Sequence, residues 1–152
     1  GLFFKRGGAL GPIVVYTDTD HAGDRFTRKS TTSIAVTING CLIADAANSQ
    51  SLMGVSSGEA EFYGGCHGVG EALHLRNLMR FFGHDLAINW ARDSSVARAI
   101  GERQGVGKIK HLATRSLWLQ ERIKEDAILP IAEPTLTNRA DLNTKVRPVK
   151  RF

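Results

Sequence analysis

The sequence predicts an α/β domain in which helices flank a five-stranded mixed sheet, three antiparallel strands being followed by two more. The prediction follows from the order of the patterns. Short β-branched stretches separated by turn residues come first, then one long stretch of helical spacing, then alternating strand and helix patterns. At 152 residues the chain is most simply one domain, long enough to bury roughly two thirds of the surface that its unfolded form exposes.

The first three strands are expected to form an antiparallel meander. The first runs over 13–17, an apolar and β-branched stretch, and it delivers Asp18 at its C-terminal end. The second and third run over 33–38 and 41–44, and Asn39-Gly40 between them is a two-residue hairpin signal.

The longest predicted helix runs over about 57–82, where apolar residues recur at helical spacing until Gly83 supplies a stop. Ser56 and Glu59 have the S-x-x-E spacing of a capping box, in which each side chain satisfies a backbone N–H at the helix start. Glu59 is therefore accounted for by the cap. Glu61 is not needed there, so its charge requires another partner.

The last third of the chain alternates strand and helix patterns. One strand contains a proline, which removes a backbone donor and so places that strand at a sheet edge. In order, we expect a strand over 87–90, helices over 94–102 and 110–124, the proline-containing strand over 127–131, and a polar turn or short helix over 136–145.

Composition restricts the class of protein. Cys41 and Cys66 lie in apolar surroundings without a His or Cys at metal-ligand spacing, so we expect reduced core residues. No apolar run approaches the roughly 20 residues of a membrane span. The formal charge of +5 suits a polyanionic partner. Basic residues gather in Arg25, Arg28 and Lys29, in Lys108, Lys110, His111 and Arg115, and in the tail Lys145, Arg147, Lys150 and Arg151.

Four acids stand at the ends of predicted elements, where a rigid scaffold presents side chains to a cleft: Asp18, Glu61, Asp93 and Asp141. If they converge, like charges about 4 Å apart repel by about 4 kcal/mol per pair at an effective dielectric near 20. Bound cations would keep such a cluster ionised. Oxygen-only ligands of this kind suit Mg²⁺ or Mn²⁺.

Five motifs occur along the chain in this order: YTDTDHAGD at 16–24, RKST at 28–31, SSGEAEF at 56–62, KHL at 110–112 and ADLNTK at 140–145. With these motifs the chain resembles the ribonuclease H domain at the C-terminus of a copia-type retrotransposon polyprotein. The resemblance covers almost the whole chain and implies a ribonuclease H-like fold over 1–152, with 1–10 a remnant of the preceding connection segment and 146–152 a basic tail.

The resemblance implies a metal-dependent endonuclease that hydrolyses the RNA strand of RNA–DNA hybrids during reverse transcription. Its ligands for two Mg²⁺ ions, which Mn²⁺ can replace, would be Asp18, Glu61, Asp93 and Asp141. The implied partners are the hybrid and the upstream reverse transcriptase and connection domains of the same polyprotein, with no membrane. The implied location is the cytoplasm, within virus-like particles.

Candidates to contact the nucleic acid lie in the first loop, beside Asp93 and in the Lys-His pair. Contacts to 2′-hydroxyl groups would select the RNA strand, since DNA lacks them. The candidates are Arg25, Arg28, Lys29, Ser30, Ser94, Ser95, Lys110 and His111.

Two other functions stay open. Copia-type domains usually have a tryptophan and several lysines where this chain has Asp45-Ala46-Ala47-Asn48-Ser49-Gln50, and a cysteine commonly precedes the residue matching Asp93. These departures motivate a catalytically impaired module that only binds hybrid or supports the polymerase. A transposase or integrase of the same broad fold is weaker, because such sites usually have three acids and here Asp141 supplies a fourth.

Overall fold

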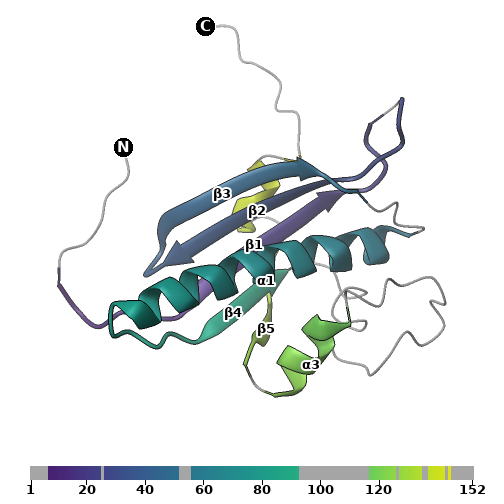
Figure 1. The fold of residues 1–152 in the computed structure, drawn as a ribbon. Helices are drawn as coiled ribbons and strands as arrows, with labels where there is room; N and C mark the ends of the chain where they lie inside the picture. The colour runs from purple at the N-terminus through teal and green to yellow at the C-terminus, as the bar shows by residue number, and fades with distance from the viewer. Residues whose placement is uncertain are drawn as a thin grey trace, which may run out of the picture.

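The computed structural model describes residues 7–24, 26–51, 56–92, 117–125, 127–134, 137–142 and 144. The described strands form one five-stranded sheet in the order β3-β2-β1-β4-β5 (Figure 1). β1 pairs antiparallel with β2 and parallel with β4, so the predicted mixed sheet is confirmed. The strands are β1 (Ile13–Asp20), β2 (Thr31–Ile38), β3 (Cys41–Ser49), β4 (Ile88–Arg92) and β5 (Leu129–Ala132).

The antiparallel meander is confirmed, but its strands are longer than the apolar pattern predicts. β1 continues to Asp20 and β2 already begins at Thr31, where the two residues pair. β3 continues to Ser49 because it is an edge strand with mostly exposed side chains, so polar residues there keep backbone pairing with β2. Asn39 and Gly40 have φ values of 51° and 76°, as a two-residue type I′ turn requires.

The long helix α1 (Ser57–Phe81) matches the prediction closely. The Ser56 hydroxyl accepts a hydrogen bond from the Glu59 N–H at 3.2 Å, which confirms the serine half of the predicted capping box. At the other end Gly83, at φ 85°, takes the left-handed conformation that ends many helices. The helix crosses one face of the sheet and contacts β1, β2 and β4 (Figure 1).

Three glycines let α1 lie unusually close to the sheet. A Cβ on Gly64 would lie 2.6 Å from Thr19 Oγ1, one on Gly68 would lie 2.5 Å from Thr17 Cγ2, and one on Gly65 would overlap the Trp90 ring. Since side chains cannot interpenetrate, any larger residue at these positions pushes helix and sheet apart.

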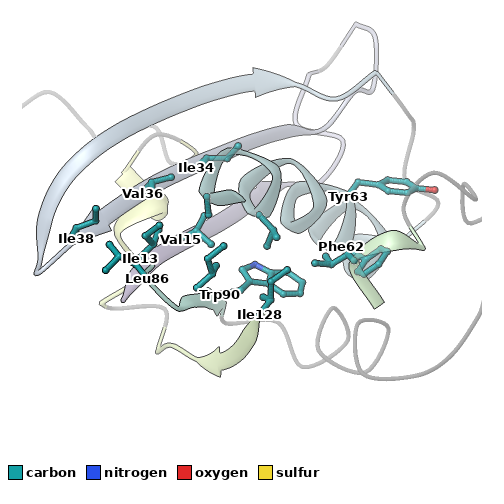
Figure 2. Packing of buried hydrophobic residues seen from close by; sticks show 14 residues of the cluster. Ile13, Val15, Ile34, Val36, Ile38, Phe62, Tyr63, Leu86, Trp90 and Ile128 are labelled. Carbon is teal, nitrogen blue, oxygen red and sulfur yellow. The ribbon is translucent and has the colours of Figure 1, made fainter. Parts of the chain in front are cut away.

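The buried core lies between α1 and the sheet, as Figure 2 shows. Trp90 and Phe62 are its largest fully buried side chains, and the indole N–H of Trp90 donates to Thr17 Oγ1 at 2.9 Å. Around them pack Ile13, Val15, Ile34, Val36, Ile38, Tyr63, Val69, Ala72, Leu86, Ile88, Leu119 and Ile128.

Beyond β4 the described chain is partial. The expected helix over 94–102 lies outside the described residues, and α3 (Trp118–Lys124) is the described part of the one expected over 110–124. β5 contains Pro130 and is an edge strand, as predicted. The expected turn or short helix over 136–145 contains a short 3₁₀ helix, η2 (Arg139–Leu142), that contacts β1 and β2.

The cysteines differ from the prediction in one respect. Cys41 and Cys66 are free thiols, as predicted, but both are half-buried instead of fully buried in the core. Cys66 packs against the outside of the core cluster. Within the described ranges, no helix combines the length and apolar character that crossing a membrane requires.

We expect Gly65→Ala to lower the free energy of unfolding by about 1–3 kcal/mol, because the added methyl group overlaps the Trp90 ring. Gly70→Ala on the same helix is the matched control. Its Cβ would meet nothing within 4 Å, so better helix propensity should stabilise the fold by about 0.5–1 kcal/mol. Urea unfolding of both variants measures the difference, and equal stabilities would show that α1 does not depend on close approach at Gly65.

Candidate active site

Asp18 and Glu61 belong to two elements that pass at one end of the sheet, the C-terminal part of β1 and the first turns of α1 (Figure 1). The backbone N–H of Thr19, the residue after Asp18, donates to Glu61 Oε1 at 3.3 Å. Both carboxyl side chains are largely buried, each residue being 8% exposed. This hydrogen bond joins β1 to α1 across 42 residues of sequence, and it involves Glu61 and the residue that follows Asp18.

The strand geometry explains why this N–H is available to Glu61. The described pairing of β1 with β4 ends at Tyr16 and Ala91, so the β4 ladder does not extend to Thr19. A backbone N–H buried without a partner costs about 1–3 kcal/mol, so the contact with Glu61 removes that cost. The Glu61 carboxylate is thereby held at the edge of β1.

Asp18 approaches the same point from the other face of the sheet. The Thr17 and Thr19 side chains contact Trp90 and α1, so strand alternation turns the Asp18 side chain away from α1. There the Thr144 hydroxyl donates a hydrogen bond to Asp18 Oδ2. Asp18 and Glu61 therefore approach the end of β1 from opposite sides.

Asp141 is carried by η2, which is anchored beside Asp18. The Asn138 side-chain amide donates to the Thr17 carbonyl at 3.1 Å, and its Oδ1 accepts from the Ala140 N–H at 3.1 Å. The Asn138 carbonyl accepts from the Asp141 N–H at 3.2 Å. One buried asparagine thus fixes η2 to the strand residue that precedes Asp18. We call Asp18, Glu61 and Asp141 the acidic site.

A buried polar network holds the start of α1 in place. The Gln50 side-chain amide donates to Thr32 Oγ1 at 2.8 Å and to the Ala60 carbonyl at 2.7 Å. The Thr19 hydroxyl also lies 3.5 Å from the Ala60 carbonyl. Because Ala60 directly precedes Glu61, this network sets where the Glu61 side chain leaves the helix.

The two glutamates at the helix start have different surroundings. Glu59 is 1% exposed, and its Oε1 accepts a hydrogen bond from the Tyr63 hydroxyl at 2.7 Å. That bond lies within α1, one turn along, whereas the Glu61 bond crosses to β1. The sequence-based separation of a cap residue from a surplus carboxylate therefore agrees with the contacts.

Of the four predicted acids, three are described and Asp93 lies outside the described residues. Among the predicted nucleic-acid contacts, Arg28 and Lys29 are exposed in the loop between β1 and β2. Ser30 is buried, and its hydroxyl accepts from the Ala22 N–H at 3.1 Å, so it orders the loop; its contact with nucleic acid stays a prediction. The remaining predicted contacts lie outside the described ranges: Arg25, Ser94, Ser95, Lys110 and His111.

The carboxylates of the acidic site determine which metal ions could bind there. Hard carboxylate oxygens are the ligands that Mg²⁺ and Mn²⁺ prefer, so the chemistry of Asp18, Glu61 and Asp141 fits such ions. Within the described part of the chain, however, no three His, Cys, Asp or Glu side chains are grouped closely enough to hold one. The carboxylates are thus the right type of ligand for Mg²⁺ or Mn²⁺, but the described residues do not by themselves form a complete metal site.

The sequence alone does not indicate the roles of three residues in this region: Gln50, Asn138 and Thr144. Gln50 stands in a stretch noted only for its missing positive charge, and Asn138 and Thr144 stand in a polar segment near Asp141. The contacts that tie them to β1 and to the start of α1 span 10 to 126 residues, so no local spacing rule could identify those contacts. The amide of Gln50 directly follows the edge strand β3, and its anchoring role can be recognised only when the strand order is known.

The sequence is similar to part of a retrotransposon polyprotein. The chain is 29% identical over 148 residues to the retrovirus-related Pol polyprotein from transposon TNT 1-94 of Nicotiana tabacum. The alignment covers 95% of this chain and 11% of the polyprotein. No family model matches the sequence.

Solved structures identify the fold. RNase H1 from Halobacterium salinarum superposes with a TM-score of 0.54 at 18% identity, over 87% of this chain and 93% of that one. The chain has the ribonuclease H fold, and its sequence is similar to part of a retrotransposon Pol polyprotein. LC11-RNase H1 in complex with an RNA/DNA hybrid gives 0.52 at 18% identity, over 86% of this chain and 91% of that one. The foamy viral protease-reverse transcriptase in complex with dsDNA gives a TM-score of 0.55 at 20% identity, over 87% of this chain and 88% of that one.

These comparisons confirm the predicted ribonuclease H-like fold and the predicted relation to a retrotransposon polyprotein. They bear on the fold and on ancestry, whereas the residues that act in this chain follow from its own geometry. The chain spans only 11% of the length of the curated relative that it matches.

We expect Gln50→Leu to lower the free energy of unfolding by about 1–3 kcal/mol, since it removes two buried hydrogen bonds, one to Thr32 Oγ1 and one to the Ala60 carbonyl. Asn48→Leu is the control, because Asn48 is exposed on β3 and should change stability by less than about 0.5 kcal/mol. Denaturant unfolding compares the two, and a Gln50→Leu variant as stable as the control would contradict the anchoring role.

Proposed function

We propose that this domain is a ribonuclease H that uses divalent metal ions to hydrolyse the RNA strand of RNA–DNA hybrids during reverse transcription. The observation that carries the proposal is the junction of β1 and α1, where the Thr19 N–H holds Glu61 beside Asp18 in a ribonuclease H fold. Buried acids at the end of a central strand stabilise a fold poorly, which favours a chemical role for them.

The residues of the chain hold the carboxylates in place before any ion binds. The Thr19 N–H orients Glu61, the Thr144 hydroxyl orients Asp18, and Asn138 anchors the turn that carries Asp141. Two Mg²⁺ ions bound there would supply Lewis acidity and neutralise charge on the scissile phosphodiester. The ligands would be Asp18, Glu61 and Asp141, together with Asp93.

The proposed substrate follows from charge and from the relatives. The net charge of +5, with Arg28 and Lys29 exposed in the loop that follows β1, suits a polyanion. One structural neighbour is a ribonuclease H1 in complex with an RNA/DNA hybrid, and another is a protease-reverse transcriptase in complex with dsDNA. We extend hybrid binding to this chain, along with attachment to an upstream reverse transcriptase and a cytoplasmic location in virus-like particles.

A non-catalytic module that binds hybrid is the second candidate. Two observations favour it: the described residues contain no group of three possible metal ligands, and β3 carries no lysine. The two candidates differ in one measurable property. The second predicts tight hybrid binding with no cleavage under either Mg²⁺ or Mn²⁺.

We expect the domain to cleave the labelled RNA strand of a hybrid in Mg²⁺, and Asp18→Asn or Glu61→Gln to reduce the rate at least about 100-fold through loss of a charged ligand. Folding should survive Glu61→Gln, because the new amide carbonyl still accepts from the Thr19 N–H. Gel analysis of cleavage products, with circular dichroism to verify folding, measures both effects.

Glu59→Gln is the matched control, since it makes the same change two residues away on a carboxylate that bonds within α1. It should lower stability by about 1 kcal/mol or less and leave cleavage active. Cleavage that persists in both Asp18→Asn and Glu61→Gln would refute the assigned roles.

A further inference from the structure

The loop between β1 and β2, residues 21–30, carries an aromatic side chain that the proposed function has not used. Phe26 is 98% exposed, the highest fraction among the large exposed hydrophobic residues that the structure describes. Single exposed apolar residues are common on protein surfaces, but a phenyl ring in nearly full contact with water forgoes about 1.5–3 kcal/mol of burial free energy. A binding partner that covers the ring would recover part of it.

Asp24 ties the loop around Phe26 into a defined turn. Its Oδ1 accepts from the N–H groups of Phe26 and Thr27, at 2.8 and 3.1 Å, and its Oδ2 accepts from the Thr27 hydroxyl at 2.7 Å. The hydrogen bond from the Thr27 side chain, followed by those from the backbone, holds the pKa of Asp24 below its usual value. Asp24 therefore stays ionised at neutral pH, and the turn that presents Phe26 is preserved.

The position and charge of the loop suit a nucleic acid. β1 ends at Asp20, two residues beyond Asp18, so the loop leaves the sheet at the end that holds the acidic site (Figure 1). Arg28 and Lys29 are exposed close to Phe26 in sequence. Asp24 offsets part of this charge, but its carboxylate oxygens are engaged by the loop's own donors. An exposed aromatic ring flanked by cations is a common nucleic-acid contact.

We propose that Phe26 is a binding residue for the nucleic acid, packing its ring on sugar and base faces in the minor groove of an RNA–DNA hybrid while Arg28 and Lys29 face the phosphates. The inference rests on the proposed function, since it takes the hybrid as the substrate. The minor groove of an A-form helix is wide and shallow, so a side chain at a loop tip can reach it. Apolar side chains such as phenylalanine are known to enter minor grooves.

The test measures binding separately from cleavage. Fluorescence anisotropy with a labelled hybrid of about 18 base pairs, in EDTA, gives the Kd without hydrolysis. We expect Phe26→Ala to raise the Kd about tenfold and Phe26→Trp to keep it within about twofold, because an indole ring also stacks. Phe81→Ala is the control: Phe81 is 81% exposed, and lies at the opposite end of α1 from Glu61.

Salt dependence distinguishes ring contact from charge. Phe26→Ala should leave the slope of log Kd against log salt unchanged, whereas Arg28→Ala should reduce it by about one. An unchanged Kd in Phe26→Ala, or an equal loss in Phe81→Ala, overturns the inference. Cleavage by the unaltered chain in Mg²⁺ is measured in parallel, so the proposed function can stand while the role of Phe26 fails.

Discussion

The close approach of α1 to the sheet is the constraint on which the rest of the structure depends. Gly64, Gly65 and Gly68 remove side chains from the helix face that meets β1 and β4, and the Trp90 ring fills the space at Gly65. Only at this separation can the Glu61 carboxylate take the Thr19 N–H. Close packing of apolar groups thus sets the position of a charged one, and an alanine at Gly65 would disturb both.

The acidic site also requires polar groups in places where they cost stability. Gln50 satisfies the Ala60 carbonyl, and Asn138 satisfies the Thr17 carbonyl, in each case one residue before an acid. Both amides bond to the backbone beside an acid and so fix the position from which the Glu61 or Asp18 side chain extends. Scaffold and site are therefore coupled: the same hydrogen bonds that fix α1 and η2 to the sheet also orient the acids.

Much of the fold follows from local patterns in the sequence. The Asn39-Gly40 turn, the capping serine Ser56 and the stop at Gly83 are local signals, and each matches the structure. The full length of β3 does not follow from the sequence pattern, because an edge strand pairs through its backbone and tolerates polar side chains. The selection of Glu61 over Glu59 was partly predictable from cap spacing, whereas the role of Gln50 depends on contacts that only the folded chain creates.

The proposed function requires that Asp18 and Glu61, held on either side of the end of β1, bind the same divalent cations. Anomalous diffraction from crystals soaked in Mn²⁺ can locate these ions, since Mn²⁺ occupies oxygen-ligand sites that suit Mg²⁺. We expect strong peaks within about 2.0–2.4 Å of carboxylate oxygens of both residues, and their loss in Asp18→Asn. Saturating Mn²⁺ with no peak at either carboxylate, or with peaks only elsewhere on the surface, would contradict it.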